Sequence, residues 1–417
     1  MNDAPFILRC FDCGHTHPPE EIRYRCHCGG TLDVEHDLRR VSQQASFDLF
    51  DRRLGARWPE DRSGVWRYRE LILPFVDVDL VCRGEGNTGL YESPGIAAYA
   101  SVKRLALKHE GENPTGSFKD RGMCVGVTMA KRLGCARVAC ASTGNTSASL
   151  AAYAAVSGLD GVVFIPSGKI AFGKLSQALA YGATTLQIEG DFDDAMRLVQ
   201  EVSNRAGIYL LNSVNPFRIE GQKAILFELL QDRGWTVPDW IVLPGGNLGN
   251  SSAIGKALIE LKTLGWIERL PRLAVIQAHG ANPLYRMVHE GLERLVPVRG
   301  AETVATAIRI GDPVSWKKCR RALEATNGVV EEVTDEEILA AKRVVDAAGI
   351  GAEPASCATV AGLKKLVESG VVDPEADICG ILTGHVLKDP QVVVDAHRDD
   401  LVSVEMDIEA ILAALNR

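Results

Sequence analysis

Lys119 is the residue of this sequence with the clearest potential for covalent chemistry. It stands in the segment 112–122 (ENPTGSFKDRG), behind a turn of Pro, Gly and Ser and at the head of an apolar, helix-like stretch, 123–130. The positive end of a helix lowers the proton affinity of an amine and favours its nucleophilic free base. Phosphate groups also bind where free backbone N–H groups point outward. A lysine that can form a Schiff base beside such turns is what pyridoxal phosphate requires, whereas the simpler alternative is a solvated lysine in the first turn of a helix.

Two loops that follow apolar, strand-like runs are suited to ligand binding. The loop 142–147 (STGNTS) could place Asn145 on a cofactor hydroxyl and use Thr146 and Ser147 to contact a carboxylate. Its alternative role is to cap the helix that follows. The loop 244–250 (PGGNLGN) would let backbone amides approach a phosphate, because glycine has no Cβ in the way. A tight turn is the alternative for this second loop.

Two other segments add groups that could hold a ligand. The segment 382–385 (LTGH) closes another apolar run, and the hydroxyl of Thr383 could donate to a pyridine nitrogen. A helix cap is the alternative for Thr383, and a structural role is the alternative for His385. The segment 212–223 (NSVNPFRIEGQK) supplies amides, a lysine and Arg218, whose guanidinium could hold an anion through two hydrogen bonds. An exposed structural arginine is the alternative there.

Four cysteines near the amino terminus, spaced Cys-x2-Cys-x12-Cys-x-Cys, predict a separate small unit over residues 1–32. They are Cys10, Cys13, Cys26 and Cys28. The spacing resembles that of a structural zinc ribbon, although its second pair is tighter than the usual Cys-x2-Cys. The alternative is a reduced, metal-free arm. Three nearby histidines could substitute as ligands: His15, His17 and His27.

The composition is that of an ordinary soluble, globular protein, with 46% hydrophobic and 24% charged residues. The net charge of −8 argues against a surface for nucleic acid or for an anionic membrane. The uncharged stretch 138–159 is broken by Ser, Thr, Asn and Gly, so we expect strand, loop and helix there and no membrane span. No secretory signal is visible at the amino terminus, and the eleven cysteines suit a reducing compartment, so we expect a cytoplasmic protein.

Beyond about residue 75, apolar strand-like runs alternate with helical patterns, which predicts parallel α/β architecture. Two sets of such units, separated near residue 215, predict two lobes whose polar loops lie beyond the carboxyl ends of the strands. The expected strands are 137–142, 161–165, 184–188, 240–243, 273–278 and 378–382. The expected helices follow the loop 142–147 and occupy 172–179 and 251–264.

The order of these motifs resembles that of the threonine synthases, within the fold type II pyridoxal-phosphate enzymes. The matching blocks are 84–88 (GEGNT), 113–122, 142–149 (STGNTSAS), 174–182 (KLSQALAYG), 212–223, 244–250, 353–356 (EPAS) and 383–390 (TGHVLKDP). Two positions depart from the family pattern: Gly89 stands where proline is usual, and Val386 replaces a common glycine.

The resemblance implies a two-lobed α/β fold with open twisted sheets, similar to the tryptophan synthase β subunit. Residues 33–122 and 216–417 would form the large cofactor-binding lobe, and 123–215 the smaller lobe. Lys119 would hold pyridoxal phosphate as a Schiff base. Around the ring, Phe118 would pack against it, Asn145 would bind its hydroxyl and Thr383 would meet its nitrogen. The cofactor phosphate would lie on Gly245, Gly246, Asn247, Leu248 and Gly249.

The substrate implied by the resemblance is O-phospho-L-homoserine. Its carboxylate would lie on the loop 142–147, including Ser142, Thr143, Asn145 and Thr146. Its phosphate would lie near Lys119, Asn212, Ser213, Arg218 and Asn250. The Lys119 amine would remove protons from Cα and Cβ, phosphate would leave from Cγ, and water adding at Cβ would give L-threonine.

Three alternatives to this activity remain open at the level of the sequence. Cysteate synthase, which takes O-phosphoserine and sulfite, shares the cofactor motifs. Threonine dehydratase does so too, but would not need a phosphate-anchoring Arg218. A catalytically idle, cofactor-binding or interaction protein on the same fold is the third. Relatives of this fold are often dimers, so a homodimer is expected by analogy.

Overall fold

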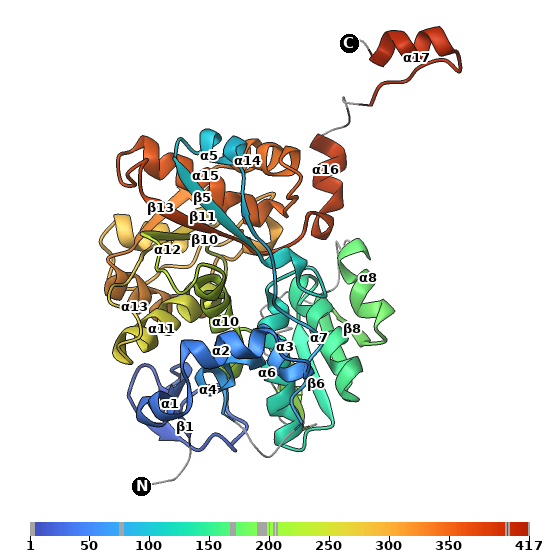
Figure 1. Cartoon of the computed structure of the whole chain (residues 1–417). Helices are drawn as coiled ribbons and strands as arrows, with labels where there is room; N and C mark the ends of the chain where they lie inside the picture. Colours follow the sequence, from blue (N-terminus) through green and yellow to red (C-terminus); the bar gives the residue numbers. More distant parts are fainter. Residues whose placement is uncertain are drawn as a thin grey trace.

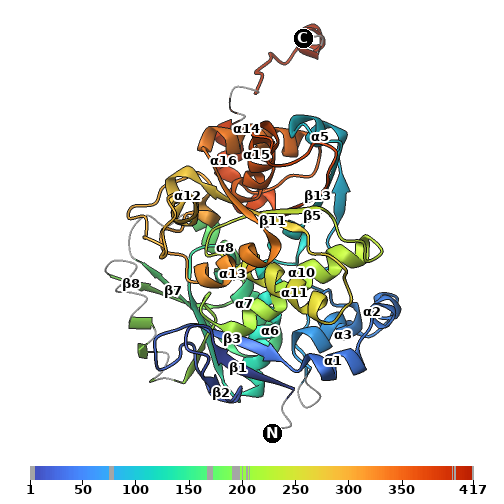
Figure 2. The ribbon, with the colours of Figure 1, turned by 90° about the vertical axis from the view of Figure 1, so that its left-hand side faces the viewer.

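The computed structural model of the chain describes residues 5–74, 79–166, 172–189, 198–199, 201–202, 205, 207–396, 398 and 401–415. Within these residues the strands form three sheets (Figures 1 and 2). The sheet near the amino terminus is antiparallel, with the strand order β2-β1-β3. Its strands are β1 (Phe6–Cys10), β2 (Thr16–His17) and β3 (Leu32–His36).

The other two sheets are the parallel α/β sheets that the sequence predicted. The six-stranded sheet has the order β12-β11-β10-β13-β5-β4, and only the edge strand β4 runs antiparallel to its neighbour. Its strands are β4 (Leu90–Glu92), β5 (Arg104–His109), β10 (Trp240–Pro244), β11 (Arg272–Ala278), β12 (Val329–Val333) and β13 (Asp377–Leu382). The four-stranded sheet is parallel, with the order β8-β7-β6-β9. Its strands are β6 (Arg137–Ala141), β7 (Asp160–Pro166), β8 (Thr184–Ile188) and β9 (Ile208–Leu210).

All six expected strands are confirmed, each to within one residue at either end. The strands that the sequence did not predict include β5, which contains Lys108 and His109 in its buried half. Charged side chains are rarely buried without partners, so a run ending in Lys-His does not look like a central strand. The partners of Lys108 come from helix α10, more than a hundred residues further on, and no local pattern reveals them.

Helices cover both parallel sheets (Figures 1 and 2). The first part of the chain contributes α1 (Leu38–Gln44), α2 (Phe47–Leu54), α3 (Pro59–Arg62), α4 (Arg69–Ile72) and α5 (Pro94–Tyr99). The middle contributes α6 (Lys119–Arg132), α7 (Asn145–Ser157), α8 (Phe172–Ala180), α10 (Pro216–Asp232) and α11 (Gly249–Thr263). The last part contributes α12 (Pro283–His289), α13 (Trp316–Thr326), α14 (Asp335–Ala347), α15 (Pro354–Glu368), α16 (Pro390–Ala396) and α17 (Ile408–Leu415). Short 3-10 helices are η1 (Trp66–Tyr68), η2 (Glu110–Glu112), η3 (His279–Ala281), η4 (Thr306–Ile308) and η5 (Val386–Lys388).

Helix α10 is the central helix of the molecule. It begins in the way its sequence predicts, because the side chain of Asn215 accepts a hydrogen bond from the N–H of Phe217, and Pro216 occupies the first helical position. Every residue from Pro216 to Gln231 is buried, and the helix packs against α6 on one side and α11 on another. A helix buried on all sides needs a partner for each polar side chain it carries. No helix among the described residues is long and apolar enough to cross a membrane.

Candidate active site

Lys119 is the first residue of α6, as the sequence predicted. The turn that precedes it is joined to the segment that follows β13. The N–H of Phe118 donates to the carbonyl of Thr383 (3.0 Å), and Ser117 forms an isolated antiparallel bridge with Gly384. Two segments that are far apart in the sequence therefore meet at the reactive lysine.

The amine of Lys119 is prepared for chemistry near neutral pH. Its Nζ lies 4.1 Å from the centre of the Phe118 ring. Removal from water and, to a smaller extent, the positive charge of Arg218 lower the pKa of Lys119 to about 7, although the carboxylate of Glu353 acts in the opposite direction. The sequence predicted a lowered proton affinity from the helix end and from burial, and in the structure burial is the main cause.

A polar cluster around Glu353 brings together two residues predicted to contact the cofactor ring. Asn145, the first residue of α7, donates from Nδ2 to Glu353 Oε2 (3.1 Å). The hydroxyl of Thr383 donates to Glu353 Oε1 (3.3 Å) and contacts Ser356 Oγ (3.1 Å). The Ser356 hydroxyl in turn accepts from the N–H groups of Thr383 and Gly384, at 2.8 and 2.9 Å. Two side chains thus donate to the same Glu353 carboxylate: Asn145, which follows β6, and Thr383, which follows β13.

Glu353 is a residue of the candidate site that the sequence did not predict. It precedes α15, is almost fully buried, and its N–H donates to the carbonyl of Gly384 (3.0 Å). Burial raises the pKa of Glu353, whereas its bond from Asn145 and the nearby amines of Lys388 and Lys119 act to lower it. An acidic residue directly before a proline at a helix start was the available signal in the block 353–356.

The glycine loop 244–250 joins β10 to α11 and has the features of a phosphate cradle. Leu248, the residue before α11, has a positive φ of 62° and provides no side-chain cap, so the first N–H groups of the helix have no side-chain partner. A Cβ on Gly245 would lie 2.6 Å from Val275 Cγ1, so the close packing here requires glycine. Asn247 accepts the N–H of Val314 at its Oδ1 (3.3 Å) and the N–H of Ser315 at its carbonyl (3.3 Å). Within the described residues its own N–H, with those of Gly246 and Gly249, is left for a ligand.

Five buried polar atoms near Lys119 have no hydrogen-bond partner among the residues that the structure describes. They are Ser117 Oγ, Arg218 Nε, Gln222 Oε1, and both Asn250 Nδ2 and Oδ1. Burial lowers the pKa of Arg218 to about 10, and its Nη1 donates only to the carbonyl of Leu211 (2.8 Å). A buried polar group without a partner costs about 1–3 kcal/mol. A ligand rich in oxygen atoms would satisfy these groups, as phosphate would.

Contacts of Gln222 show that these atoms lie together. Gln222 stands one turn after Arg218 on α10, and its Oε1 is 3.7 Å from the position of a Cβ on Gly249, next to Asn250. Its Nε2 is 3.0 Å from the position of a Cβ on Gly122, in the first turn of α6. Gln222 therefore lies between the helix that carries Lys119 and the glycine loop. A glutamine within a helix carries no signal of its own, so the sequence did not predict this position for Gln222.

Other predicted substrate-binding residues lie in the same region but differ in what they contact. Asn212 uses both ends of its amide on the backbone of Ala141, with Oδ1 accepting at 3.0 Å and Nδ2 donating at 3.1 Å. Its side chain thus prolongs the pairing of β6, and its predicted contact with substrate stays a prediction. The Ser142 hydroxyl accepts from the N–H of Gly144 (3.2 Å). The remaining three residues are half-buried near the ends of β6 and β9: Thr143, Thr146 and Ser213.

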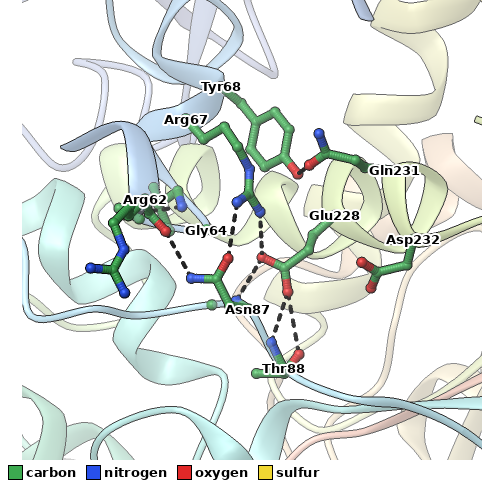
Figure 3. Close-up of polar contacts among 12 residues, drawn as sticks. Arg62, Gly64, Arg67, Tyr68, Asn87, Thr88, Glu228, Gln231 and Asp232 are labelled. Atoms are coloured by element: carbon green, nitrogen blue, oxygen red, sulfur yellow. Dashed lines mark hydrogen bonds and ion pairs between the residues drawn. The ribbon is translucent and has the colours of Figure 1, made fainter. Parts of the chain in front are cut away.

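A buried ion cluster supports the site from behind, and we call its members Arg67, Lys108, Glu110, Arg121, Glu228 and Asp232 the Glu228 cluster. Glu228 accepts from Arg121 (2.8 Å), Arg67 (3.2 Å) and Lys108 (2.8 Å). It also accepts the N–H groups of Asn87 (2.8 Å) and Thr88 (3.0 Å), as Figure 3 shows. The surrounding cations hold the pKa of Glu228 well below its usual range even though burial opposes this. The cluster fixes the loop 84–88 and the first turn of α6 to α10.

The departure from the family pattern at Gly89 has a structural reason. The N–H of Gly89 donates to Glu112 Oε2 (2.5 Å), a bond that proline could not make. A Cβ at Gly89 would also overlap the ring of Tyr91, whose hydroxyl binds the same carboxylate. The loop is thus held by a hydrogen bond where the usual family member has a rigid ring.

The four amino-terminal cysteines lie together, with all four Sγ atoms within 4.8 Å of one another. Cys10 and Cys28 are 3.5 Å apart at Sγ, and Cys13 and Cys26 are 3.6 Å apart. Thiolates around a tetrahedral zinc with bonds of about 2.3 Å lie about 3.8 Å apart, so the set fits that metal. His17 Nε2 is 3.4 Å from Cys26 Sγ and stands beside the group.

A second set of buried ions joins this small unit to α10. His36 on β3 contacts Glu220 Oε2 through Nε2 (2.6 Å), and Lys223 contacts Glu220 (2.7 Å) and Glu260 (2.6 Å). Lys256 on α11 binds Glu220 as well. The amino-terminal unit is therefore attached to the helix that carries Arg218.

Comparison with known proteins agrees with this geometry. The family model described as "Pyridoxal-phosphate dependent enzyme" matches residues 81–384. The fold is shared with maize serine racemase (TM-score 0.64, 20% identity, covering 85% of this chain and 98% of that one). It is also shared with threonine deaminase isoform 2 of Solanum lycopersicum (TM-score 0.61, 20% identity, covering 73% and 86%). The chain belongs to the pyridoxal-phosphate-dependent enzymes, with the expected fold type II architecture.

Relatives of higher identity define its place within that class. The chain is 45% identical over 406 residues to the threonine synthase of Methanocaldococcus jannaschii, covering 97% of this chain and 98% of the relative. It is 47% identical over 412 residues to that of Methanosarcina acetivorans, covering 98% of each. The chain is a member of the threonine synthase family.

Proposed function

We propose that this enzyme converts O-phospho-L-homoserine and water into L-threonine and phosphate, with pyridoxal phosphate held on Lys119. The observation that carries the proposal is the pairing of a lysine of lowered pKa with buried, unpartnered polar groups around Arg218. The lysine supplies a base for an amino-acid substrate. The polar groups around Arg218 supply a binding site for the phosphate of that substrate. The family membership supports the same reaction.

The residues present fit the cofactor. Lys119 would bind it covalently, the backbone of Gly245–Gly249 would hold its phosphate, and Asn145 and Thr383 would meet its ring. The uncapped start of α11 and the unpartnered atoms of Asn250 are the observations behind this fit. When bound, pyridoxal phosphate withdraws electrons from the substrate and so weakens its C–H bonds.

Lys119 is the group that moves protons. With a pKa of about 7, its amine can both accept and return a proton at neutral pH. We assign to it the removal of the Cα proton and then of a Cβ proton. The C–O bond to phosphate then breaks at Cγ, a proton is added there, and water supplies the hydroxyl at Cβ.

Arg218 and Asn250 would hold the departing phosphate. The guanidinium of Arg218 is buried and unpaired at Nε, so it keeps hydrogen-bonding capacity for an anion. Charge that develops on the leaving group is stabilised most by donors already in place. The substrate carboxylate would lie on the first turn of α7 and the preceding loop, with Ser142, Thr143 and Thr146.

The rest of the chain has supporting parts in this proposal. Residues 1–32 would form a zinc-binding unit, 33–122 with 216–417 the large lobe, and 123–215 the smaller lobe. The eleven cysteines all lie in the described part of the chain and none forms a disulfide, which suits a reducing compartment, so we place the enzyme in the cytoplasm. We also propose a homodimer, by analogy with the fold.

A product assay tests the reaction. Purified enzyme with pyridoxal phosphate should release phosphate from O-phospho-L-homoserine and form L-threonine in equal amount. O-phosphoserine with sulfite should give no cysteate, and formation of cysteate in place of threonine would refute the proposal. Metal analysis of protein purified without chelator should find about one zinc per chain, and its absence would refute the zinc site.

A further inference from the structure

Lys388, like Lys119, differs from the five lysines that are almost fully buried in the described part of the chain. Those lysines all lie within 4 Å of a carboxylate oxygen: Lys108, Lys223, Lys256, Lys318 and Lys342. Lys388 is half-buried at the end of η5, and among the described residues it forms no ion pair. Its Nζ donates to a neutral acceptor, Gln177 Oε1, at 2.5 Å. A half-buried ammonium with only an amide partner keeps capacity for an anion.

Lys388 lies close to the reactive Lys119, so an anion bound by its ammonium would be near the reactive amine. A Cβ on Gly116 would lie 2.9 Å from Lys388 Cε and 3.6 Å from its Nζ. Gly116 belongs to the turn that ends at Lys119, and the N–H of His385 donates to its carbonyl (3.0 Å). Lys388 therefore lies against the turn that positions the catalytic amine, five residues after Thr383.

The partner of Lys388 comes from the other parallel sheet. Gln177 lies on α8, which connects β7 and β8 of the four-stranded sheet, whereas Lys388 follows β13 of the six-stranded sheet. The bond between them joins the two halves of the molecule beside the site. Glu353 and Asp120 are near enough to raise the pKa of Lys388, but burial outweighs them and lowers it overall.

We propose that Lys388 is a specificity-determining residue that binds an anionic oxygen of the substrate, exchanging the Gln177 amide for it. The inference rests on the proposed function, since the substrate carries two anionic groups, a carboxylate and a phosphate. Lys388 is then a second recognising cation, distinct from Arg218: it lies against Gly116, before Lys119, whereas Arg218 lies against Gly122, after it. Because the amide is neutral and the substrate group is charged, the exchange favours the substrate.

Substitution with matched controls tests this role. Lys388→Gln should raise KM for the phosphorylated substrate at least about tenfold, the loss expected for one charge-assisted hydrogen bond, while kcat changes less. The visible absorbance of the cofactor in the free enzyme should not change. Lys388→Arg should restore most of the affinity, and Gln177→Ala should leave KM unchanged or lower it. The exposed Lys103, which pairs with Glu375, provides a control in Lys103→Gln.

Equilibrium binding separates the two anionic groups. The cofactor absorbance is titrated with inorganic phosphate and, separately, with L-homoserine, which keeps the carboxylate and lacks the phosphate. If Lys388→Gln weakens the binding of inorganic phosphate and not that of L-homoserine, Lys388 binds the substrate phosphate. If it weakens the binding of L-homoserine and not that of phosphate, Lys388 binds the substrate carboxylate. Unchanged KM and unchanged binding of both ligands would overturn the inference. So would equal losses in Gln177→Ala and Lys388→Gln, which would reduce the pair to a structural contact. Wild-type enzyme that forms no threonine would instead refute the proposed function.

Discussion

Two regions of α10 are equally buried and equally polar, yet they are built in opposite ways. Around Glu228, three cationic side chains and two backbone N–H groups converge on one carboxylate and satisfy it. Around Arg218 and Gln222, ten and six residues earlier and about 15 and 9 Å along the axis, polar atoms lack partners among the described residues. The Glu228 carboxylate is thus fully paired as folded, although Arg67 Nε beside it has no partner among the described residues, whereas we propose that a ligand pairs the atoms of the second region. On this proposal, the difference separates residues that hold the fold from residues that perform the reaction.

The largest expected effect is at the lysine between these regions. Lys119→Ala should lower turnover by at least about a thousandfold, because both the covalent attachment and the base are lost. The visible absorbance of the bound cofactor should disappear as well. The free energy of unfolding of the apoprotein should stay the same or rise, since a buried amine is removed. Retention of turnover by a folded variant would contradict the role of Lys119.

Removing the negative charge of Glu228 should instead lower the stability of the fold. Glu228→Gln leaves Arg121, Lys108 and Arg67 buried with an excess of positive charge, so the free energy of unfolding should fall by about 3–5 kcal/mol. Denaturant titration measures this. The control is Glu375→Gln, in an exposed pair with Lys103, which should not change stability. If both variants were equally stable, the Glu228 cluster would not be what holds α10 and the loop 84–88 together.

Removing the positive charge of Arg218 should leave the stability of the fold nearly unchanged. Arg218→Met keeps the length of the side chain, and we expect the free energy of unfolding to change by less than about 1 kcal/mol or to rise, because no buried anion loses a partner. KM for the phosphorylated substrate should rise about ten- to a hundredfold. Destabilisation as large as that of Glu228→Gln would erase the distinction between the two regions.

The smallest expected effect is on how the rate of cofactor attachment depends on pH. Because burial lowers the pKa of Lys119 to about 7, its free base forms as the pH rises through 7. Attachment of pyridoxal phosphate to the apoprotein should therefore speed up with pH and level off above about 7, whereas an ordinary lysine would continue to gain up to about 10.4. Glu353→Gln should shift the midpoint lower, since the Glu353 carboxylate raises this pKa. A rate still rising at pH 9 would contradict the burial argument.

Local patterns in the sequence predicted much of the fold and the central residues of the site. Apolar runs located six strands to within a residue, and the motifs located Lys119 at the start of a helix with Asn145 and Thr383 nearby. These predictions worked because periodicity and turn residues act over short distances.

What the sequence did not show depends on partners far apart in the chain. Glu353 and Gln222 gain their roles only from neighbours that the fold supplies. Lys108 in β5 is compatible with burial because Glu228 reaches it from α10. Such pairings have no local signature, and the same holds for the contact between Lys388 and Gln177.

Helix α10 presents Arg218 and Gln222 to the site, Glu220 and Lys223 to the amino-terminal unit, and Glu228 to the Glu228 cluster. Successive residues of an α-helix are rotated by about 100°. An insertion or deletion of one residue near Lys223 would turn Glu228 away from Arg121 while Arg218 stayed in place. We therefore expect this helix to accept changes of side chain more readily than any change in its length.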